Sequence, residues 1–284
     1  MVRVRKAAVV PAQAYFVVSA IFHYLGPALA VLLFARIEPL GVAWLRIAAA
    51  GLIFWLWRRP LRTWRSLGPA TRRLLLGWGA VLAVMNCTFY LAIDRVPLGT
   101  VAAAEFAPVI VLAAIAVRSA RNLLSLVLAV TGVYLLTDIR LSHDWIGLVC
   151  TALNALLFAA YVVLGHRVSR VDGLPRIDGL ALAMGTATVI ALPIGIVEAV
   201  PAFGDPALLA AAVGVGVCSS VIPYVCDQLA MARLRRSTFA VMLALLPATA
   251  TVIGALVLQQ IPLPAELFAV AIIVVAVGLH REAT

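Results

Sequence analysis

The amino-acid sequence predicts an all-α integral membrane protein whose ten transmembrane helices form two inverted five-helix repeats. Composition, the placement of basic residues and an internal repeat each point to this fold class. Of the 284 residues, 64% are hydrophobic and 12% are charged, with a mean hydropathy of +1.10. Soluble domains carry about 25% charged residues. The apolar residues also fall in unbroken runs, such as Leu74–Leu82 and Val109–Val117, which leave no polar face for water.

The apolar runs are long and numerous enough for ten spans. A helix needs roughly 20 mostly apolar residues to cross a bilayer, and charge clusters, prolines and glycines divide the chain into segments of about that length. The expected spans are 11–34, 39–57, 74–93, 97–117, 122–137, 145–165, 178–198, 207–229, 237–258 and 264–280. The first run extends to Phe34, beyond the apolar core of a signal peptide, so we expect it to be a span and not a cleaved leader.

The basic residues indicate the orientation, because Lys and Arg concentrate in cytoplasmic loops. With the N-terminus inside, 18 of the 22 basic residues lie in cytoplasmic segments, and six of them lie between spans two and three. The opposite loops hold Arg36, Arg95 and Arg140, and Arg46 lies within span two. We therefore expect a multi-pass protein of the bacterial inner membrane with both termini in the cytoplasm.

An internal repeat divides the chain into halves, 1–140 and 141–284. The segment from Arg95 to Thr100 leads to Pro108 in span four, and the segment from Arg233 to Thr238 leads to Pro247 in span nine. Because five is an odd number, two five-span halves have opposite orientations in the membrane. Inverted repeats are typical of secondary transporters, which bind substrate near the midplane between the halves and expose it alternately to each side.

Several stretches resemble the EamA type of the drug/metabolite transporter superfamily, and in particular its threonine/homoserine exporter branch. The stretches are FARIEPLGVAWLR (Phe34–Arg46), MNCTFYLAIDRVPLGT (Met85–Thr100) with Ala104–Phe106, Trp145–Tyr161, and Ile222–Arg233. The resemblance implies ten helices in two inverted repeats, a central cavity, and export of amino acids or similar small metabolites. The chain departs from the family pattern in span nine, where Leu245 and Leu246 replace a glutamate and Gln259 or Gln260 replaces a terminal acidic residue.

Two ionisable residues within spans are candidate substrate-binding residues, since a charge there costs about 2.5–3.5 kcal/mol on insertion scales. At 1.5 Å per residue, Arg46 lies about 10 Å and Glu105 about 12 Å inside the outer ends of their spans, so the two lie at similar depth. One interpretation is a structural salt bridge. The other is a pair that binds the carboxylate and ammonium of a zwitterion, or that exchanges a proton at Glu105.

Further polar residues within spans extend the predicted substrate site. His23 lies midway along span one, and its ordinary pKa near 6.5 suits proton coupling, although a lone histidine in a membrane span is more often a hydrogen-bonded packing residue. Asn86 and Tyr90 share one face of span three, and Asn154 and Tyr161 form a similar stripe on span six; these residues either line the site or join helices.

Near the cytoplasmic end of span eight, Tyr224 is a candidate substrate ligand and Asp227 a candidate gate or proton-coupling residue. A carboxylate so near the aqueous boundary also fits a plain surface charge.

The sequence argues against several other classes. The net charge of +10 falls in short clusters between apolar segments, which favours topology signals over a nucleic-acid partner. The four cysteines form no CxxC pair, the four histidines are scattered, and no phosphate-binding loop is present, so we expect no enzyme, metal, cofactor or ATP coupling. The expected partners are a small-molecule substrate, membrane lipids and protons, and homodimer formation stays open. A drug-like or lipid-linked substrate is the alternative to an amino acid, and an integral-membrane enzyme is the alternative of another class.

Overall fold

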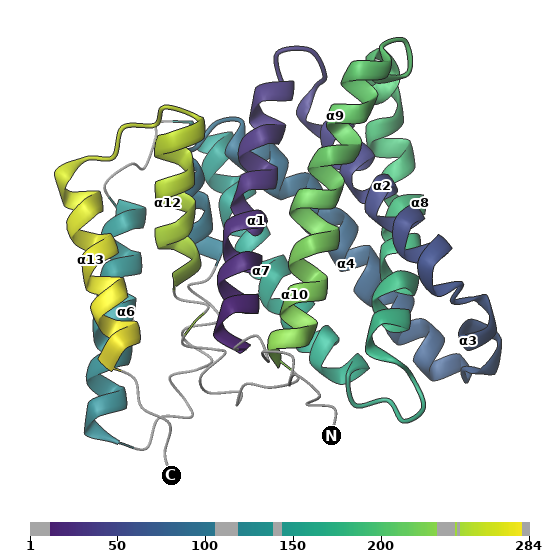
Figure 1. Cartoon of the computed structure of the whole chain (residues 1–284), viewed down its shortest axis with the longest axis horizontal. Helices are drawn as coiled ribbons and strands as arrows, with labels where there is room; N and C mark the ends of the chain where they lie inside the picture. Colours follow the sequence, from purple (N-terminus) through teal and green to yellow (C-terminus); the bar gives the residue numbers. More distant parts are fainter. Residues whose placement is uncertain (1–11, 106–118, 139–143, 232–241, 243–244, 280–284) are drawn as a thin grey trace, which may run out of the picture.

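The computed structural model describes residues 12–105, 119–138, 144–231, 242 and 245–279, and its regular secondary structure there is helical. Figure 1 shows the helices running mostly side by side. Their bounds are α1 (Ala12–Leu33), α2 (Pro39–Arg58), α3 (Leu61–Ser66), α4 (Pro69–Ile93), α6 (Ala120–Asp138), α7 (Trp145–Val168), α8 (Arg176–Phe203), α9 (Pro206–Gly216), the π-helical turn η1 (Val217–Val221), α10 (Ile222–Met231), α12 (Leu245–Val257) and α13 (Pro264–Leu279). Residues 98–105 are also helical and begin the fourth predicted span.

Six helices in the described ranges are long and apolar enough to cross a membrane, which supports the prediction of a multi-pass membrane protein. They are α1, α2, α4, α7, α8 and the continuous segment of α9, η1 and α10 through Asp227. The observed α4 begins at Pro69, before the predicted start at 74, and α8 continues to Phe203, past the predicted end at 198. The predicted spans 97–117 and 237–258 lie partly outside the described residues, so the total of ten stays a prediction.

Prolines and aspartates determine where several helices begin. Pro39, Pro69 and Pro206 occupy the first turns of their helices, where a backbone N–H has no intrahelical partner and its absence costs nothing. Asp144 and Asp205 precede α7 and α9, and one carboxylate oxygen of each accepts two backbone N–H groups of the first turn. These caps fix where two of the spans begin.

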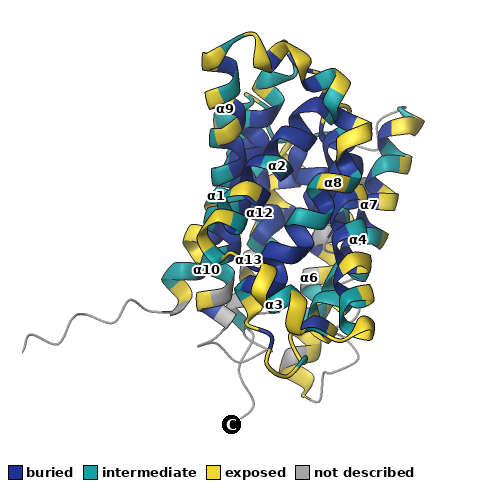
Figure 2. Ribbon diagram, turned by 90° about the vertical axis from the view of Figure 1, so that its right-hand side faces the viewer, coloured by how far each residue is buried: buried dark blue, intermediate teal, exposed yellow. Residues whose placement is uncertain are grey.

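Helices α2 and α8 are antiparallel and make the most extensive helix–helix interface among the described residues. Glycines permit this close approach: a side chain at Gly41 or Gly195 would overlap backbone atoms of the partner helix, and one at Gly51 would overlap Thr188. Across the same interface, the Trp44 indole N–H donates to the Thr188 carbonyl at 3.2 Å. In Figure 2, buried residues are concentrated along α2, which lies within the bundle.

Carboxylates of α8 hold both ends of α2. Glu198 accepts a hydrogen bond from the Gly41 amide at 3.1 Å, in the first turn of α2. At the other end, Asp178 accepts from Arg58 Nε and from the Thr63 hydroxyl, both at 2.7 Å. The first contact places negative charge at a helix N-terminus, where the helix dipole favours it. The register of α2 against α8 is thus fixed at two points.

Three further interfaces involve the remaining helices. Helix α4 packs on α7, where the Trp78 indole donates to the Tyr161 carbonyl at 3.1 Å. Helix α1 packs on η1 and α10, and α6 packs on α13, with the Ser125 hydroxyl donating to the Ala276 carbonyl at 2.6 Å. Figure 1 shows α6 and α13 together at one side of the bundle and α1 beside α10 near its middle.

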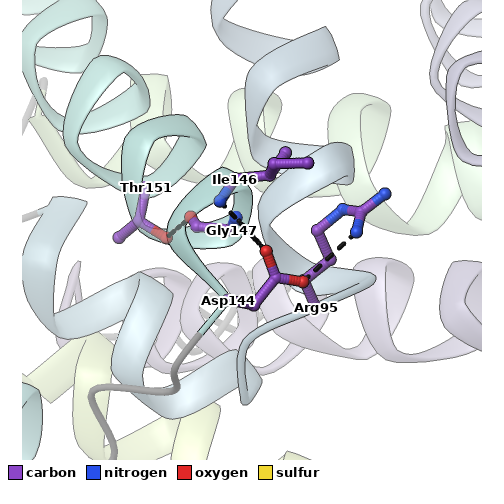
Figure 3. A network of polar contacts seen from close by, with 5 residues as sticks. All are labelled: Arg95, Asp144, Ile146, Gly147 and Thr151. Carbon is purple, nitrogen blue, oxygen red and sulfur yellow. Dashed lines mark hydrogen bonds and ion pairs between the residues drawn. The ribbon is translucent and has the colours of Figure 1, made fainter.

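Two ion pairs join the first half of the chain to the second at the end of the bundle where α1 meets α2 and α8 meets α9 (Figure 1). Arg36 binds Asp205 at 3.0 Å, and Arg95 binds Asp144 at 3.2 Å. Both carboxylates are the helix caps described above. Figure 3 shows Asp144 between the Arg95 guanidinium and the amides of Ile146 and Gly147. Each aspartate therefore serves a helix start and an interhelical contact at once.

A methyl group at Gly195 is expected to destabilise the α2–α8 interface, because it would overlap the Leu40 carbonyl and Trp44 Cβ. We expect Gly195→Ala to lower the free energy of unfolding by about 1–3 kcal/mol, measured as a lower melting temperature of the detergent-purified protein. Gly77→Ala is the matched control, since Gly77 lies in α4 with open space around it. Equal melting temperatures for the two variants would contradict this account of the interface.

The Asp205 cap is expected to make stability depend on acid pH. Hydrogen bonds from the Leu208 and Ala207 amides, together with Arg36, lower the pKa of Asp205 from its ordinary value of 3.8. Because the folded-state pKa is the lower one, the stabilisation is present above pH 3.8 and is lost as the pH falls through the folded-state pKa. Asp205→Asn should therefore lower the melting temperature near neutral pH, and the difference from wild type should shrink in acid.

Asp172→Asn is the control for this titration, because Asp172 is exposed and has no hydrogen bond or ion pair within the described residues. The account fails if the Asp205→Asn and Asp172→Asn variants show the same melting profile from about pH 2 to about pH 7.

Candidate functional site

Buried polar side chains from six helical segments meet inside the bundle, and we call them the central polar cluster. Each is at most 5% exposed. The cluster consists of Tyr24 of α1, Arg46 of α2, Tyr90 of α4, Glu105 of residues 98–105, Asn154 of α7, and Ser219 and Ser220 of η1. Membrane-spanning helices consist mostly of apolar residues, so this concentration of polar groups marks the site that needs a functional explanation.

Arg46 contacts three members of this cluster. Its Nε donates to Ser220 Oγ at 3.1 Å, and its Nη2 donates to the Ser219 carbonyl at 3.2 Å. The guanidinium carbon lies 5.5 Å from the centroid of the Tyr90 ring, within cation–π range. Among the residues that the structure describes, Nη1 has no hydrogen-bond partner. One edge of the guanidinium is thus held by η1 and one face by Tyr90, while other donors remain available.

The Ser219 carbonyl is available to Arg46 because of Pro223. In an α-helix this carbonyl would accept the N–H of residue 223, which proline lacks. The Ile222 N–H instead donates to the Val217 carbonyl, five residues earlier, which makes Val217–Val221 a π-helical turn. Such turns occur frequently at functional sites.

Five buried side-chain atoms in this cluster have no hydrogen-bond partner among the described residues. They are Tyr24 Oη, Tyr90 Oη, Glu105 Oε2, and the Nδ2 and Oδ1 atoms of Asn154. The Tyr90 hydroxyl lies near Arg46 and Ser219 but is in hydrogen-bond geometry with neither. Most buried polar atoms in native proteins are paired, and each unpaired one costs about 1–3 kcal/mol. The cluster is therefore suited to a polar molecule that would supply the missing partners.

Arg46 and Glu105 do not form an ion pair, since none of the three salt bridges in the described part of the chain joins them. The two groups remain within electrostatic range of each other, and the Asn154 amide lies beside the Glu105 carboxyl. The salt-bridge interpretation of the sequence is thus not seen in this conformation. The arrangement offers a cationic and an anionic group to one ligand.

Comparison with known proteins places this architecture in a family. The model of the EamA-like transporter family matches residues 145–280. The threonine/homoserine exporter RhtA of Salmonella typhimurium (strain LT2) is 32% identical over 255 residues, which cover 88% of this chain and 84% of the exporter. The RhtA of Escherichia coli (strain K12) is 31% identical over the same shares. The chain belongs to the EamA-like transporter family.

A solved structure supports the fold of this EamA-type transporter. A crystal structure of a protein with 17% sequence identity matches with a TM-score of 0.65 over 95% of this chain and 97% of that chain. At this level of identity the likeness concerns the fold alone.

The remaining predicted site residues lie at different distances from the central polar cluster. His23 adjoins it, with its ring edge-on to Tyr24 at 5.3 Å and within electrostatic range of Arg46. Asn86 is buried, but its amide nitrogen donates to the Leu82 carbonyl of its own helix at 2.7 Å. The Asn86 amide nitrogen is thereby paired within α4, and the role of Asn86 as a ligand stays a prediction.

A second polar group leads from the cluster along α10. The hydroxyls of Tyr161 and Tyr224 interact with each other, and Tyr161 also stacks on Trp78 at 5.4 Å. Asp227 is half-buried one turn further along α10, beside Ser19 of α1. The Ser19 hydroxyl donates to the Pro223 carbonyl at 3.3 Å. Tyr224 and Asp227 thus lie in α10, which continues directly from η1 of the central polar cluster.

Gln260, one of the glutamines noted in the sequence, has a structural role at the end of the bundle where α12 is followed by α13. The Gln260 side-chain oxygen accepts the Leu98 amide at 3.3 Å, at the start of the helical residues 98–105, where backbone N–H groups lack intrahelical partners. Gln260, Thr100 and Glu266 are among the residues that line a cavity of about 20 Å³, which has room for one water molecule and not for a substrate. Within the described ranges, no group of three or more His, Cys, Asp or Glu residues could hold a metal ion.

Sequence inspection missed three members of the cluster, namely Tyr24, Ser219 and Ser220. A usable signal was present for the serines, since they are a polar pair in an apolar span and Ser219 lies four residues before Pro223. Tyr24 directly follows His23, but nothing in the sequence distinguishes it from an interfacial tyrosine.

Replacing an unpaired hydroxyl should separate ligand binding from stability. Tyr24→Phe removes a buried oxygen without a partner, so the melting temperature of the ligand-free protein should be unchanged or higher, equivalent to as much as about 1 kcal/mol. The stabilisation produced by a bound substrate should fall in the same variant. Tyr134→Phe, on the exposed face of α6, is the control and should change neither quantity. A large loss of stability in Tyr24→Phe would show that its hydroxyl is structural.

Proposed function

We propose that this protein exports small zwitterionic amino acids of the threonine/homoserine type across the bacterial inner membrane, and that it binds them in the central polar cluster. The observation that carries the proposal is the set of five polar atoms that have no partner among the described residues, together with an edge of Arg46 that is likewise free there. The names of the RhtA relatives supply the substrate class. The charges of Arg46 and Glu105 balance those of a zwitterion.

The proposed binding mode assigns a partner to each unpaired group. The substrate carboxylate binds the free edge of Arg46 and the Tyr90 hydroxyl. Its ammonium binds Glu105 and the oxygen of the Tyr24 hydroxyl, which lies within electrostatic range of Glu105. Hydrogen bonds to charged groups are the stronger ones, so these contacts supply most of the affinity. The side-chain hydroxyl of threonine or homoserine then binds the amide of Asn154, which can donate and accept.

We further propose that residues 1–140 and 141–284 are inverted repeats. The helix interfaces described above support this, because exchanging each of their helices with its counterpart in the other half reproduces the same interfaces. The interface of α1 with η1 and α10 exchanges with that of α7 with α4. The α2–α8 and α6–α13 interfaces map onto themselves. The central polar cluster then lies between the halves, where inverted-repeat transporters bind substrate.

The distribution of charge supports the proposed orientation, with both termini in the cytoplasm. Arg36 and Arg95, at the proposed outer face, are each paired with an aspartate. At the opposite end, four exposed arginines around α3 have no acidic partner among the described residues. These are Arg59, Arg62, Arg65 and Arg73. Unneutralised basic residues are typical of cytoplasmic loops.

Proton antiport is the proposed energy source. Glu105 can hold either a proton or the substrate ammonium, so that binding of one releases the other. Asp227, Tyr224 and Tyr161 extend from the cytoplasmic side toward the cluster, and His23 adjoins it. These side chains are the proposed proton route, with Asp227 at the cytoplasmic gate.

Transport by purified protein in proteoliposomes tests the proposal. With labelled L-threonine and a panel of other amino acids, the wild type should show saturable transport that an imposed proton gradient accelerates. Glu105→Gln should reduce the transport rate at subsaturating substrate about 10- to 100-fold, which corresponds to the loss of a charged hydrogen bond. Glu38→Gln is the matched control, because Glu38 is exposed and its side chain caps no helix amide.

Each other outcome has a definite meaning. If folded wild-type protein transports no amino acid, the result would contradict the proposed substrate class and favour drug-like or lipid-linked substrates. Full activity of Glu105→Gln would remove Glu105 from the binding mode.

A further inference from the structure

We infer that Pro223, Ser219 and Ser220 form a positioning element that orients the Arg46 guanidinium for a carboxylate. This inference rests on the proposed function, in which Arg46 binds the carboxyl group of the substrate. It assigns a role to three residues that the proposed binding mode does not itself use.

The first step is the release of a backbone carbonyl. Pro223 has no N–H for the Ser219 carbonyl, and the Ile222 N–H is directed to Val217. A bare carbonyl within a membrane-spanning helix costs several kcal/mol unless another donor reaches it. Arg46 Nη2 is that donor, at 3.2 Å. The Ser219 carbonyl therefore needs Arg46 as its donor, and the Arg46 guanidinium needs the acceptors of the π-helical turn.

The second step concerns the geometry of the guanidinium, which is planar and carries five N–H groups in a fixed fork. The bonds to Ser219 and Ser220 hold the edge that contains Nε and Nη2. The Tyr90 ring at 5.5 Å limits rotation about that edge by covering one face. The N–H groups that remain, two on Nη1 and one on Nη2, form the edge that binds carboxylates through two parallel hydrogen bonds.

The third step is that close packing keeps the positioning element in place. A side chain at Gly216, directly before η1, would approach the Arg46 carbonyl to 2.9 Å, and a side chain at Gly26 of α1 would overlap Ser219. The turn is thus held between α1 and α2 with no space for a larger residue on either side. Its two acceptors for Arg46 are fixed before substrate arrives, which reduces the ordering cost of binding.

This arrangement predicts a defect that is specific for the carboxylate. Pro223→Ala restores an N–H that can take the Ser219 carbonyl, so Arg46 loses one of its two anchors. Recognition of a carboxylate should suffer, whereas recognition of the ammonium and of the side-chain hydroxyl should not. L-threonine and L-threoninamide differ in the carboxyl group and report on this distinction.

The experiment is competition of each compound against labelled L-threonine bound to the detergent-purified full-length protein. Wild type should bind L-threonine at least about tenfold more tightly than L-threoninamide. Pro223→Ala should weaken L-threonine binding about tenfold and change L-threoninamide binding less than about twofold, so that discrimination is lost. Pro193→Ala is the matched control, because Pro193 lies within α8 on an exposed face and should leave both affinities unchanged.

Ser220→Ala is the second variant, and it keeps the inference testable if Pro223→Ala does not fold. It removes the acceptor for Arg46 Nε without a change in the backbone and should reduce the discrimination in the same way. Equal weakening of both compounds would indicate a merely structural role and would overturn the inference, as would discrimination that both variants preserve. If wild type does not bind L-threonine at all, the proposed function fails, and the inference fails with it.

Discussion

The requirement to satisfy one buried guanidinium organises the centre of this protein. Arg46 is 5% exposed in an apolar span, where an unpaired charge would oppose insertion and folding. Its partners come from η1, through a hydroxyl and a carbonyl, and from α4, through an aromatic ring. The α2–α8 interface delivers the arginine to this position, since glycine contacts set the distance between the helices and the bonds of Glu198 and Asp178 set their register. Packing between α2 and α8 thus determines where the positive charge of Arg46 lies.

Much of the fold follows from the sequence because the bilayer leaves few alternatives. Long apolar runs without a polar face must become membrane helices, and Pro39 and Pro206 mark helix starts that agree closely with the expected spans. The short helix α3 was hidden in the basic loop between spans two and three, since its six residues carry no apolar period that could be recognised. The extension of α4 contains Arg72 and Arg73, which resemble a loop. That of α8 follows Glu198 and contains Pro201, which together resemble the end of a span.

The candidate site was less accessible from sequence. Arg46 and Glu105 stood out because charges are rare in spans, and both are buried in the central polar cluster, yet their separation could not be deduced from equal depth alone. The role of Ser219 depends on a backbone carbonyl, which every residue has and no pattern of side chains reveals. Asn86 illustrates the opposite difficulty, because a polar side chain within a span can satisfy itself on its own helix through the Leu82 carbonyl.

The two aspartate caps, Asp144 and Asp205, have a consequence for the reversibility of the contacts that they make. Asp144 and Asp205 each bind an arginine with one carboxylate oxygen and two backbone amides with the other. Parting from the arginine therefore leaves the helix start intact, and the freed guanidinium, already a third or more exposed, returns to water at little cost. The two ion pairs can therefore break and re-form many times while the first turns of α7 and α9 stay intact. This property suits a transporter, which changes conformation in every cycle.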